Sequence, residues 1–394
     1  MFDSVISRRG SGSYKWDTVV GDGIIERGAY PLSVADMEFR TPPEVRRAIS
    51  DFSEKGFFCY TDSDDVYRDA VRQFMLRRHD FKIDNDWIVC TGGVVCAINT
   101  AIRAFTSPGD RVIIQSPVYY PFRNSIEKNE RVVADNPLLR DGNTYRMDLD
   151  SLRRLAEQED TKLMLLCSPH NPVGRVWTRD ELRAVGEICL QNNVILLSDE
   201  IHFDILRSGV EHTVINNVDE RFASNTVICT AVSKSFNLAG LGTSNIIIAD
   251  EGLRERFKTR LSRDGYSCIN CVSRPATISA YSECDYWLDA MNNYVDENIL
   301  LTKSIVDGID GIDMIECQGT YLVWLDMKGL GMDDEALDSF LQERCGIIPD
   351  PGFWFGENGK GFTRLNVACP REVLKEKLLA LAEECKRIGG VQSK

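Results

Sequence analysis

The chain has 394 residues, of which 43% are apolar, so it can bury a large core and is long enough for more than one domain. Its 60 acidic and 46 basic residues give a net charge of -14, which opposes binding to nucleic acid or to an anionic membrane. The opening MFDSVISRRG has no apolar signal segment and no apolar run reaches the roughly 20 residues of a membrane helix, so we expect a cytoplasmic protein.

From about residue 87 the sequence alternates short apolar runs with longer helical patterns, which is typical of α/β units on a largely parallel sheet. Helices are expected at 95–105 and at 178–191, where Thr178 and Glu181 are spaced as a capping box. The apolar runs predict strands at residues 87–90, 111–115, 162–167, 194–198, 226–231 and 245–249.

The pattern differs toward both ends of the chain. Periodicity is weak before residue 50, and residues 286–307 predict a long helix. Beyond it we expect strands at 319–326 and 362–367 and helices at 333–344 and 371–387. We therefore predict three parts, namely an N-terminal segment 1–48 that joins the small domain, a large domain 49–287, and a small α+β domain 288–394.

Ligands of open α/β sheets bind beyond the carboxyl ends of the strands, so the residues that follow each predicted strand are candidates for a site. After 87–90, Gly93 and Val94 begin a helix whose backbone N–H groups can face a phosphate. After 111–115 come Tyr119 and Tyr120, of which one ring can cover a planar ligand and the other offer a hydroxyl.

The next three strands are followed by an amide, a carboxylate and an amine. The turn SPHNPVG presents Asn171. Asp199 follows four apolar residues and Ser198, so its charge needs a cation or strong donors, and His202 is three residues further on. Lys234 lies between two serines behind an apolar strand, where partial burial would lower the pKa of its amine.

Taken singly, each of these features has an ordinary explanation, such as a turn, a helix cap, core packing or a surface charge. Together they supply a phosphate cradle, an aromatic cover, an amide, a buried carboxylate and a lysine. Pyridoxal 5'-phosphate uses all five, because its phosphate, ring, phenolic oxygen, pyridine nitrogen and aldehyde each need one of them. The sequence therefore predicts this cofactor, bound as an imine to Lys234.

Metal chemistry is not predicted. The 13 cysteines have no regular spacing, which favours reduced thiols, and the pair Cys268 and Cys271 in CINC has no second pair at zinc-ribbon distance. The four histidines show neither HxxxH nor HExxH spacing.

The segments NPVG, SDEIHFD and SKSFNLAG resemble fold-type I pyridoxal phosphate enzymes of the class I/II aminotransferase superfamily. PLSVADMEF, SPVYYPF, SPHNPVGRVW, GTYLVW and FTRLNVACP are similar to the MalY/PatB group of cystathionine β-lyases, which includes cystalysin. The resemblance implies an α/β, PLP-dependent transferase fold, whose large domain contains a mostly parallel seven-stranded sheet.

The resemblance also implies individual roles. The catalytic residues would be Lys234 as Schiff base, Asp199 at the pyridine nitrogen and Tyr119 stacked on the ring. Asn171 would donate to the ring oxygen, and His202 would lie near the ring where many aminotransferases have a tyrosine. The phosphate would contact three residues of one subunit and one of its neighbour, which implies a homodimer with shared active sites: Gly93, Val94 and Ser233, with Tyr60 from the neighbour.

Arg364 would bind the α-carboxylate of an amino-acid substrate as a bidentate fork, and Tyr120 would also contact the substrate. Two positions depart from wider patterns. Gly242 stands where many aminotransferases have a phosphate-binding arginine, which suits the lyase group, and Ser33 replaces a tryptophan frequent in that group. The shape of the substrate pocket therefore stays open.

The implied activity is that of a carbon–sulfur β-lyase, which cleaves L-cystathionine or a related cysteine thioether to a thiol such as homocysteine, pyruvate and ammonia. Lys234 would remove the α-proton before sulfur leaves. An aminotransferase would use the same cofactor residues, so the cofactor motifs alone do not separate the two. An additional regulatory role, by binding a transcription factor, is the third alternative.

Overall fold

The apolar runs between residues 88 and 247 form one seven-stranded sheet in the computed structural model, which describes residues 1–18 and 28–392. The strand order is β2-β10-β9-β8-β7-β3-β4, and every neighbouring pair is parallel except the two that involve β10. This arrangement confirms the predicted fold class. The strands are β2 (Ile88–Thr91), β3 (Arg111–Ile114), β4 (Val132–Asp135), β7 (Thr161–Cys167), β8 (Ile195–Asp199), β9 (Thr226–Thr230) and β10 (Ser244–Ile247).

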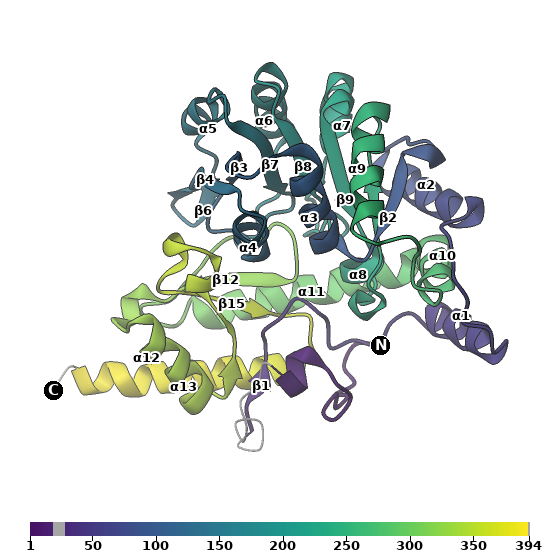
Figure 1. Ribbon diagram of the computed structural model, residues 1–394. Helices are drawn as coiled ribbons and strands as arrows, with labels where there is room; N and C mark the ends of the chain where they lie inside the picture. Colours follow the sequence, from purple (N-terminus) through teal and green to yellow (C-terminus); the bar gives the residue numbers. More distant parts are fainter. Residues whose placement is uncertain (19–27, 393–394) are drawn as a thin grey trace.

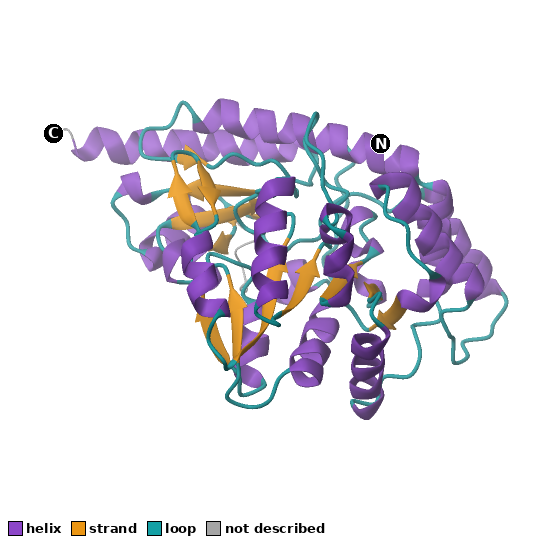
Figure 2. Cartoon of the chain, turned by 90° about the horizontal axis from the view of Figure 1, so that it is seen from above, coloured by secondary structure: helices purple, strands orange, loops and turns teal. Residues whose placement is uncertain are grey.

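Helices cover both faces of this sheet, as Figure 2 shows, which explains why its central strands are apolar on both sides. In β7, Leu163 and Leu165 belong to one apolar cluster together with residues of α3, α4 and α9, whereas Met164 and Leu166 belong to a second cluster that includes residues of α5 and α6. The helices of this part are α1 (Pro43–Glu54), α2 (Asp65–His79), α3 (Val94–Phe105), α4 (Pro121–Lys128), α5 (Leu149–Ala156), α6 (Arg179–Gln191), α7 (Ile215–Val218), α8 (Val232–Ser235), α9 (Glu251–Arg263) and α10 (Ser273–Glu283).

A second, antiparallel sheet lies beside the first, with the order β11-β12-β15-β14 (Figure 1). The long helix α11 (Asp285–Val306) extends from α10 past the second sheet, and the domain boundary that we propose at 287/288 lies within its first turn. The other elements of this part are β11 (Asp313–Met314), β12 (Leu322–Asp326), α12 (Asp334–Ser339), β13 (Ile347–Ile348), β14 (Asp350–Pro351), β15 (Phe362–Asn366) and α13 (Arg371–Gln392).

The N-terminal segment reaches this second part through β1 (Tyr30–Pro31), which pairs in parallel with β13. Beyond β1, residues 32–39 cross between the two sheets, and we call them the N-terminal strap. Asn366 in β15 holds the strap by donating its side-chain amide to the carbonyl oxygens of Val34 (2.7 Å) and Asp36 (2.6 Å).

The predicted elements are found with small shifts at their ends. Residues 333–344 are helical but change from α12 to a π-type turn at Phe340–Arg344, and the last helix continues to Gln392. The strand patterns missed β4 and the β5–β6 hairpin (Leu139–Asp141 and Thr144–Arg146), which are short and partly exposed. All 13 cysteines are free thiols, as predicted. Within the described ranges, no helix has the length and apolar content needed to cross a bilayer.

The capping box predicted from Thr178 and Glu181 is present at the start of α6, and its contribution to stability can be tested. Thr178 accepts the backbone N–H of Glu181 (3.2 Å), and Glu181 accepts the backbone N–H of Thr178 (2.8 Å). Thr178→Ala should therefore lower the free energy of unfolding by about 1 kcal/mol, measured from the midpoint of urea unfolding. Thr259→Ala is the matched control, because Thr259 is exposed inside α9 and alanine favours a helix. Equal destabilisation by both changes would contradict the assignment.

Candidate active site

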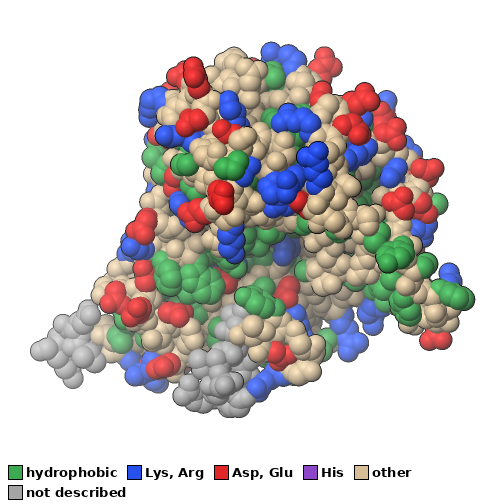
Figure 3. Space-filling model, in the orientation of Figure 1, with side chains coloured by type: hydrophobic (Ala, Val, Ile, Leu, Met, Phe, Trp, Pro, Cys, Tyr) green, Lys and Arg blue, Asp and Glu red, His purple; other side chains and the backbone are tan. Residues whose placement is uncertain are grey.

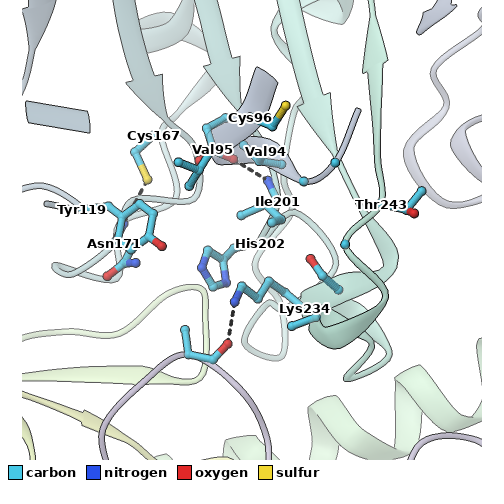
Figure 4. Close-up of a pocket in the computed structure, with 17 residues that line it drawn as sticks. Val94, Val95, Cys96, Tyr119, Cys167, Asn171, Ile201, His202, Lys234 and Thr243 are labelled. Carbon is cyan, nitrogen blue, oxygen red and sulfur yellow. Dashed lines mark hydrogen bonds between the residues drawn. The ribbon is translucent and has the colours of Figure 1, made fainter. Parts of the chain in front are cut away.

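A cavity of about 260 Å³ lies at the carboxyl ends of β7, β8 and β9, beside the first turn of α3 (Figure 4). It is at the edge of the sheet where α/β proteins bind ligands. Eight of the residues predicted from the sequence line it: Gly93, Val94, Tyr119, Asn171, Asp199, His202, Ser233 and Lys234.

Three predicted residues do not line this cavity. Arg364 lies behind Asn171 and is hydrogen-bonded to it. Tyr120 instead lines a neighbouring cavity with Trp354 and Phe355. Tyr60 is 96% exposed on the surface of its own chain. Its predicted role belongs to a neighbouring subunit and stays a prediction.

Lys234 projects from the one-turn helix α8, which begins two residues after β9 ends. Its Nζ donates to the carbonyl oxygen of Ala35 in the N-terminal strap (2.6 Å; Figure 4). Burial lowers the pKa of Lys234 to about 8, and the nearby Arg364 charge acts in the same direction, against Asp36 and Asp199. A substantial fraction of this amine is therefore neutral near physiological pH and can act as a nucleophile or a base.

Asp199 is the last residue of β8, with Cys167 of β7 and Cys229 of β9 opposite it in the sheet. Burial raises the pKa of this carboxyl group to about 7, although the N–H of Ile201 donates to its Oδ1 (3.2 Å) and Lys234 is near. A cation placed in the cavity against this carboxylate would favour its charged form. A protonated pyridine nitrogen is such a cation.

The first turn of α3 is open to the cavity. Its N-cap is Gly93, whose φ of 111° and ψ of 161° suit only glycine, and no side chain caps the helix. A Cβ atom at Gly93 would meet no atom within 4 Å, so space for a ligand remains above this turn. Ser233, Gly242 and Thr243 line the same end. Free backbone N–H groups and the helix dipole make this end suitable for a phosphate.

The Asn171 side chain is oriented by Arg364, whose Nη1 donates to the amide oxygen (2.8 Å). The amide nitrogen of Asn171 therefore points away from the guanidinium and can donate toward the cavity, as predicted for the ring oxygen of the cofactor. Tyr119 is half-buried in the same wall, and its removal from water raises the pKa of its hydroxyl, so the tyrosine stays neutral.

Arg364 is fully buried, and its charge is balanced by a residue that the sequence did not point to. Both Nε (3.1 Å) and Nη2 (2.6 Å) donate to one oxygen of Asp350, which also accepts the backbone N–H of Val34 (3.0 Å). The Nε and Nη2 side of the guanidinium is thus bound to Asp350 and is not free to bind a substrate carboxylate as a bidentate fork. Within the described residues, one N–H on each terminal nitrogen remains for an incoming carboxylate.

His202 lies beside Lys234 in the cavity wall, and its Nδ1 has no hydrogen-bond partner among the described residues (Figure 4). Burial lowers the pKa of this imidazole, and the charges of Lys234 and Arg364 lower it further. His202 is therefore neutral and has a ring nitrogen free for a bound group.

Two further residues of the site come from distant segments. The hydroxyl of Tyr321 donates to the carbonyl oxygen of Ala35 (2.9 Å), the same atom that accepts from Lys234. Ala35 lies in the segment PLSVADMEF and Tyr321 in GTYLVW. Their hydrogen bond joins positions 286 residues apart, and only the structure shows that both segments meet next to the Lys234 amine. Asp350 was not predicted as a site residue. The sequence feature that could have indicated it is its place shortly after the apolar pair of β13, where an acidic residue becomes buried.

The sequence matches the family model for aminotransferases of class I and II over residues 28–381. Cystathionine beta-lyase PatB of Bacillus subtilis (strain 168) is 37% identical over 378 residues, covering 96% of this chain and 97% of PatB. Protein MalY of Escherichia coli (strain K12) is 32% identical over 383 residues, covering 96% and 97%. Cystalysin from Treponema denticola, whose crystal structure contains pyridoxal 5'-phosphate, has a TM-score of 0.93 and 40% identity, covering 98% of this chain and 99% of that chain.

These similarities and the sheet topology define the fold as that of the fold-type I transferases, as the sequence predicted. The chain belongs to the class I and II aminotransferase family, and it is similar over nearly its whole length to the MalY and PatB proteins within it.

The lowered pKa of Lys234 predicts how the cofactor-free protein reacts with an aldehyde. The fraction of neutral amine increases as pH rises through about 8, instead of through the ordinary value of 10.5. The rate constant of imine formation with pyridoxal 5'-phosphate, followed by absorbance, should therefore level off above about pH 9. Lys234→Ala gives the background rate. A rate that still rises steeply near about pH 10 would contradict the buried position of the amine.

Proposed function

We propose that the chain is a pyridoxal phosphate-dependent carbon–sulfur β-lyase that releases a thiol, pyruvate and ammonia from L-cystathionine or a related cysteine thioether. The observation that carries the proposal is the cavity itself, which joins the Lys234 amine, the Asp199 carboxylate and the open end of α3. The name of PatB as a cystathionine β-lyase, at 37% identity over most of both chains, supports the reaction.

The residues fit pyridoxal 5'-phosphate at each of its functional groups. The first turn of α3 with Ser233 would hold the phosphate, Asp199 would keep the pyridine nitrogen protonated, and Asn171 would donate to the ring oxygen. Tyr119, which lines the same cavity, would cover the ring and exclude water. When bound, the cofactor supplies an electron sink for the bond that breaks at the substrate α-carbon.

Lys234 has two roles in this proposal. Its neutral amine would hold the cofactor through the aldehyde group, and the same Nζ, when free, would take the α-proton of the substrate. The carbonyl oxygen of Ala35 is an acceptor for the protonated Nζ, and Tyr321 keeps this carbonyl in place. Lys234 therefore holds the proton close to the substrate while sulfur leaves from the β-carbon.

Arg364 binds the α-carboxylate of the substrate through its remaining N–H groups. Asp350 and Asn171 fix the plane of the guanidinium before substrate arrives, so little side-chain entropy is lost on binding. This fixed plane would orient a bound substrate relative to the Lys234 amine.

The homodimer with shared active sites is part of this proposal. Phe57, Phe58 and Tyr60 follow α1 and are 76%, 64% and 96% exposed. Hydrophobic side chains gather on this side of the molecule, near α1 (Figure 3). An apolar surface of this kind favours a protein partner, and a second copy would bring Tyr60 toward the phosphate end of the other site. The cytoplasmic location stays a prediction from the sequence.

The product pattern tests the reaction. L-Cystathionine incubated with the holoenzyme and no keto acid should give pyruvate, ammonia and a free thiol in equal amounts. Lys234→Ala should lose the imine absorbance and reduce turnover by at least roughly 1000-fold, because both cofactor attachment and proton transfer need the amine. Turnover that requires 2-oxoglutarate and gives no pyruvate would instead identify an aminotransferase.

Arg364→Lys should lower kcat/KM for the same substrate roughly 100-fold, about 2.7 kcal/mol, because a lysine cannot keep the contacts to Asp350, Asn171 and a carboxylate together. Most of the loss should be in KM. Arg103→Lys is the matched control, since Arg103 pairs with Asp264 at the far end of α3. An unchanged KM in Arg364→Lys would remove Arg364 from the substrate site.

A further inference from the structure

Two buried pairs of a histidine and a carboxylate lie behind the cavity, and the mechanism above uses neither. His79 Nε2 is 2.7 Å from Asp204 Oδ1, and His212 Nε2 is 2.8 Å from Glu200 Oε2. All four side chains are at most 5% exposed. Both imidazoles pack on Phe203, His79 stacked at 4.0 Å and His212 edge-on at 6.3 Å between ring centroids. The two pairs differ in the other hydrogen bonds that each carboxylate accepts.

Asp204 holds the residue next to the catalytic amine. Its Oδ2 accepts the hydroxyl of Ser235, which follows Lys234 in α8 and is completely buried. Glu200 instead accepts from Ser198 (2.9 Å) and from the backbone N–H of Ile215 (3.2 Å), neither of which belongs to α8. Only the Asp204 pair therefore has a direct connection to the helix of Lys234.

The helix α8 needs such a connection because it has a single turn. One backbone bond within that turn, from Phe236 N–H to the Val232 carbonyl (3.0 Å), sets its pitch, and Asn237 then leaves it in a left-handed conformation. Phe236 packs edge-on against the stacked rings of Phe74 and Tyr281, and Ser235 is the polar anchor beside it. Lys234 points the other way, into the cavity (Figure 4).

Asp204 and His79 are themselves fixed by hydrogen bonds from two other helices. Asp204 lies in the loop after β8, and its carbonyl oxygen accepts from Asn292 of α11 (2.7 Å). His79 ends α2, and its carbonyl oxygen accepts from Asn217 of α7 (3.0 Å). The hydroxyl hydrogen of Ser235 is directed at Asp204, because the hydroxyl is the donor in this bond and a carboxylate oxygen is the acceptor.

We propose that Asp204, supported by His79, is a positioning residue that places the Lys234 amine by holding Ser235. The inference rests on the proposed function, since it concerns how fast Lys234 reacts with the cofactor and the substrate. Asp204 acts through the position of α8, and a small displacement of a reacting amine costs a large part of its rate.

The test compares wild type, Ser235→Ala, Asp204→Asn, the double variant and His79→Asn, with His212→Asn as the matched control. The first readout is the rate constant at which the cofactor-free protein forms its imine with pyridoxal 5'-phosphate. We expect this rate constant to fall roughly tenfold in Ser235→Ala and in Asp204→Asn. It should fall no further in the double variant, because the two substitutions remove the same Ser235–Asp204 hydrogen bond. In the holoenzyme kcat should fall by a similar factor while KM for L-cystathionine changes less than about twofold.

His79→Asn should move the imine rate in the same direction, whereas His212→Asn should leave it at the wild-type value. Wild-type imine rates in Ser235→Ala and Asp204→Asn would overturn the inference, even if their unfolding temperatures fell. Additive losses in the double variant would also overturn it, because the two residues would then act separately. Failure of the proposed function gives a different result, because the wild-type protein would then form no imine. Failure of the positioning inference leaves imine formation in the wild type intact.

Discussion

The burial of the Lys234 amine is the interaction on which the rest of the site depends. Removing an amine from water favours its neutral form, and the surrounding charges are arranged so that this effect is only partly reversed. Asp199 and Asp36 attract the protonated form, Arg364 repels it, and the Ala35 carbonyl accepts its hydrogen bond. The amine can therefore alternate between neutral and charged forms at a small cost, which a residue that both attacks a carbonyl group and carries a proton requires.

The N-terminal strap makes this environment possible by closing the cavity opposite the large sheet. Asn366 and Asn237 hold it through side-chain amides, and Asp350 accepts the N–H of Val34. Val34 has a φ of 52°, an unfavourable conformation for a β-branched residue. Several polar contacts on both sides compensate for that strain, so the strap has one position relative to both sheets and the carbonyl of Ala35 is available at a fixed point.

The central strands and the residues that follow them could be predicted because both depend on local sequence. Apolar runs identify buried strands, and parallel strands end at one edge, so Asn171, Asp199 and Lys234 had to converge. The strand β4 was missed because Val132 is exposed at the edge of the sheet. The contacts of the strap and of Asp350 could not be predicted, since they join segments far apart in the chain whose approach depends on the packing of whole domains.

The same strap has a consequence for how the chain folds during synthesis. It is made among the first forty residues, yet its partners Asn237, Tyr321, Asp350 and Asn366 emerge from the ribosome much later. The large sheet, whose strands end at residue 247, can assemble before the strap has anything to bind. Closure of the cavity around Lys234 is therefore complete only after β15 has been made, and a nascent or truncated chain that lacks β15 would lack the Asn366 amide that holds the strap.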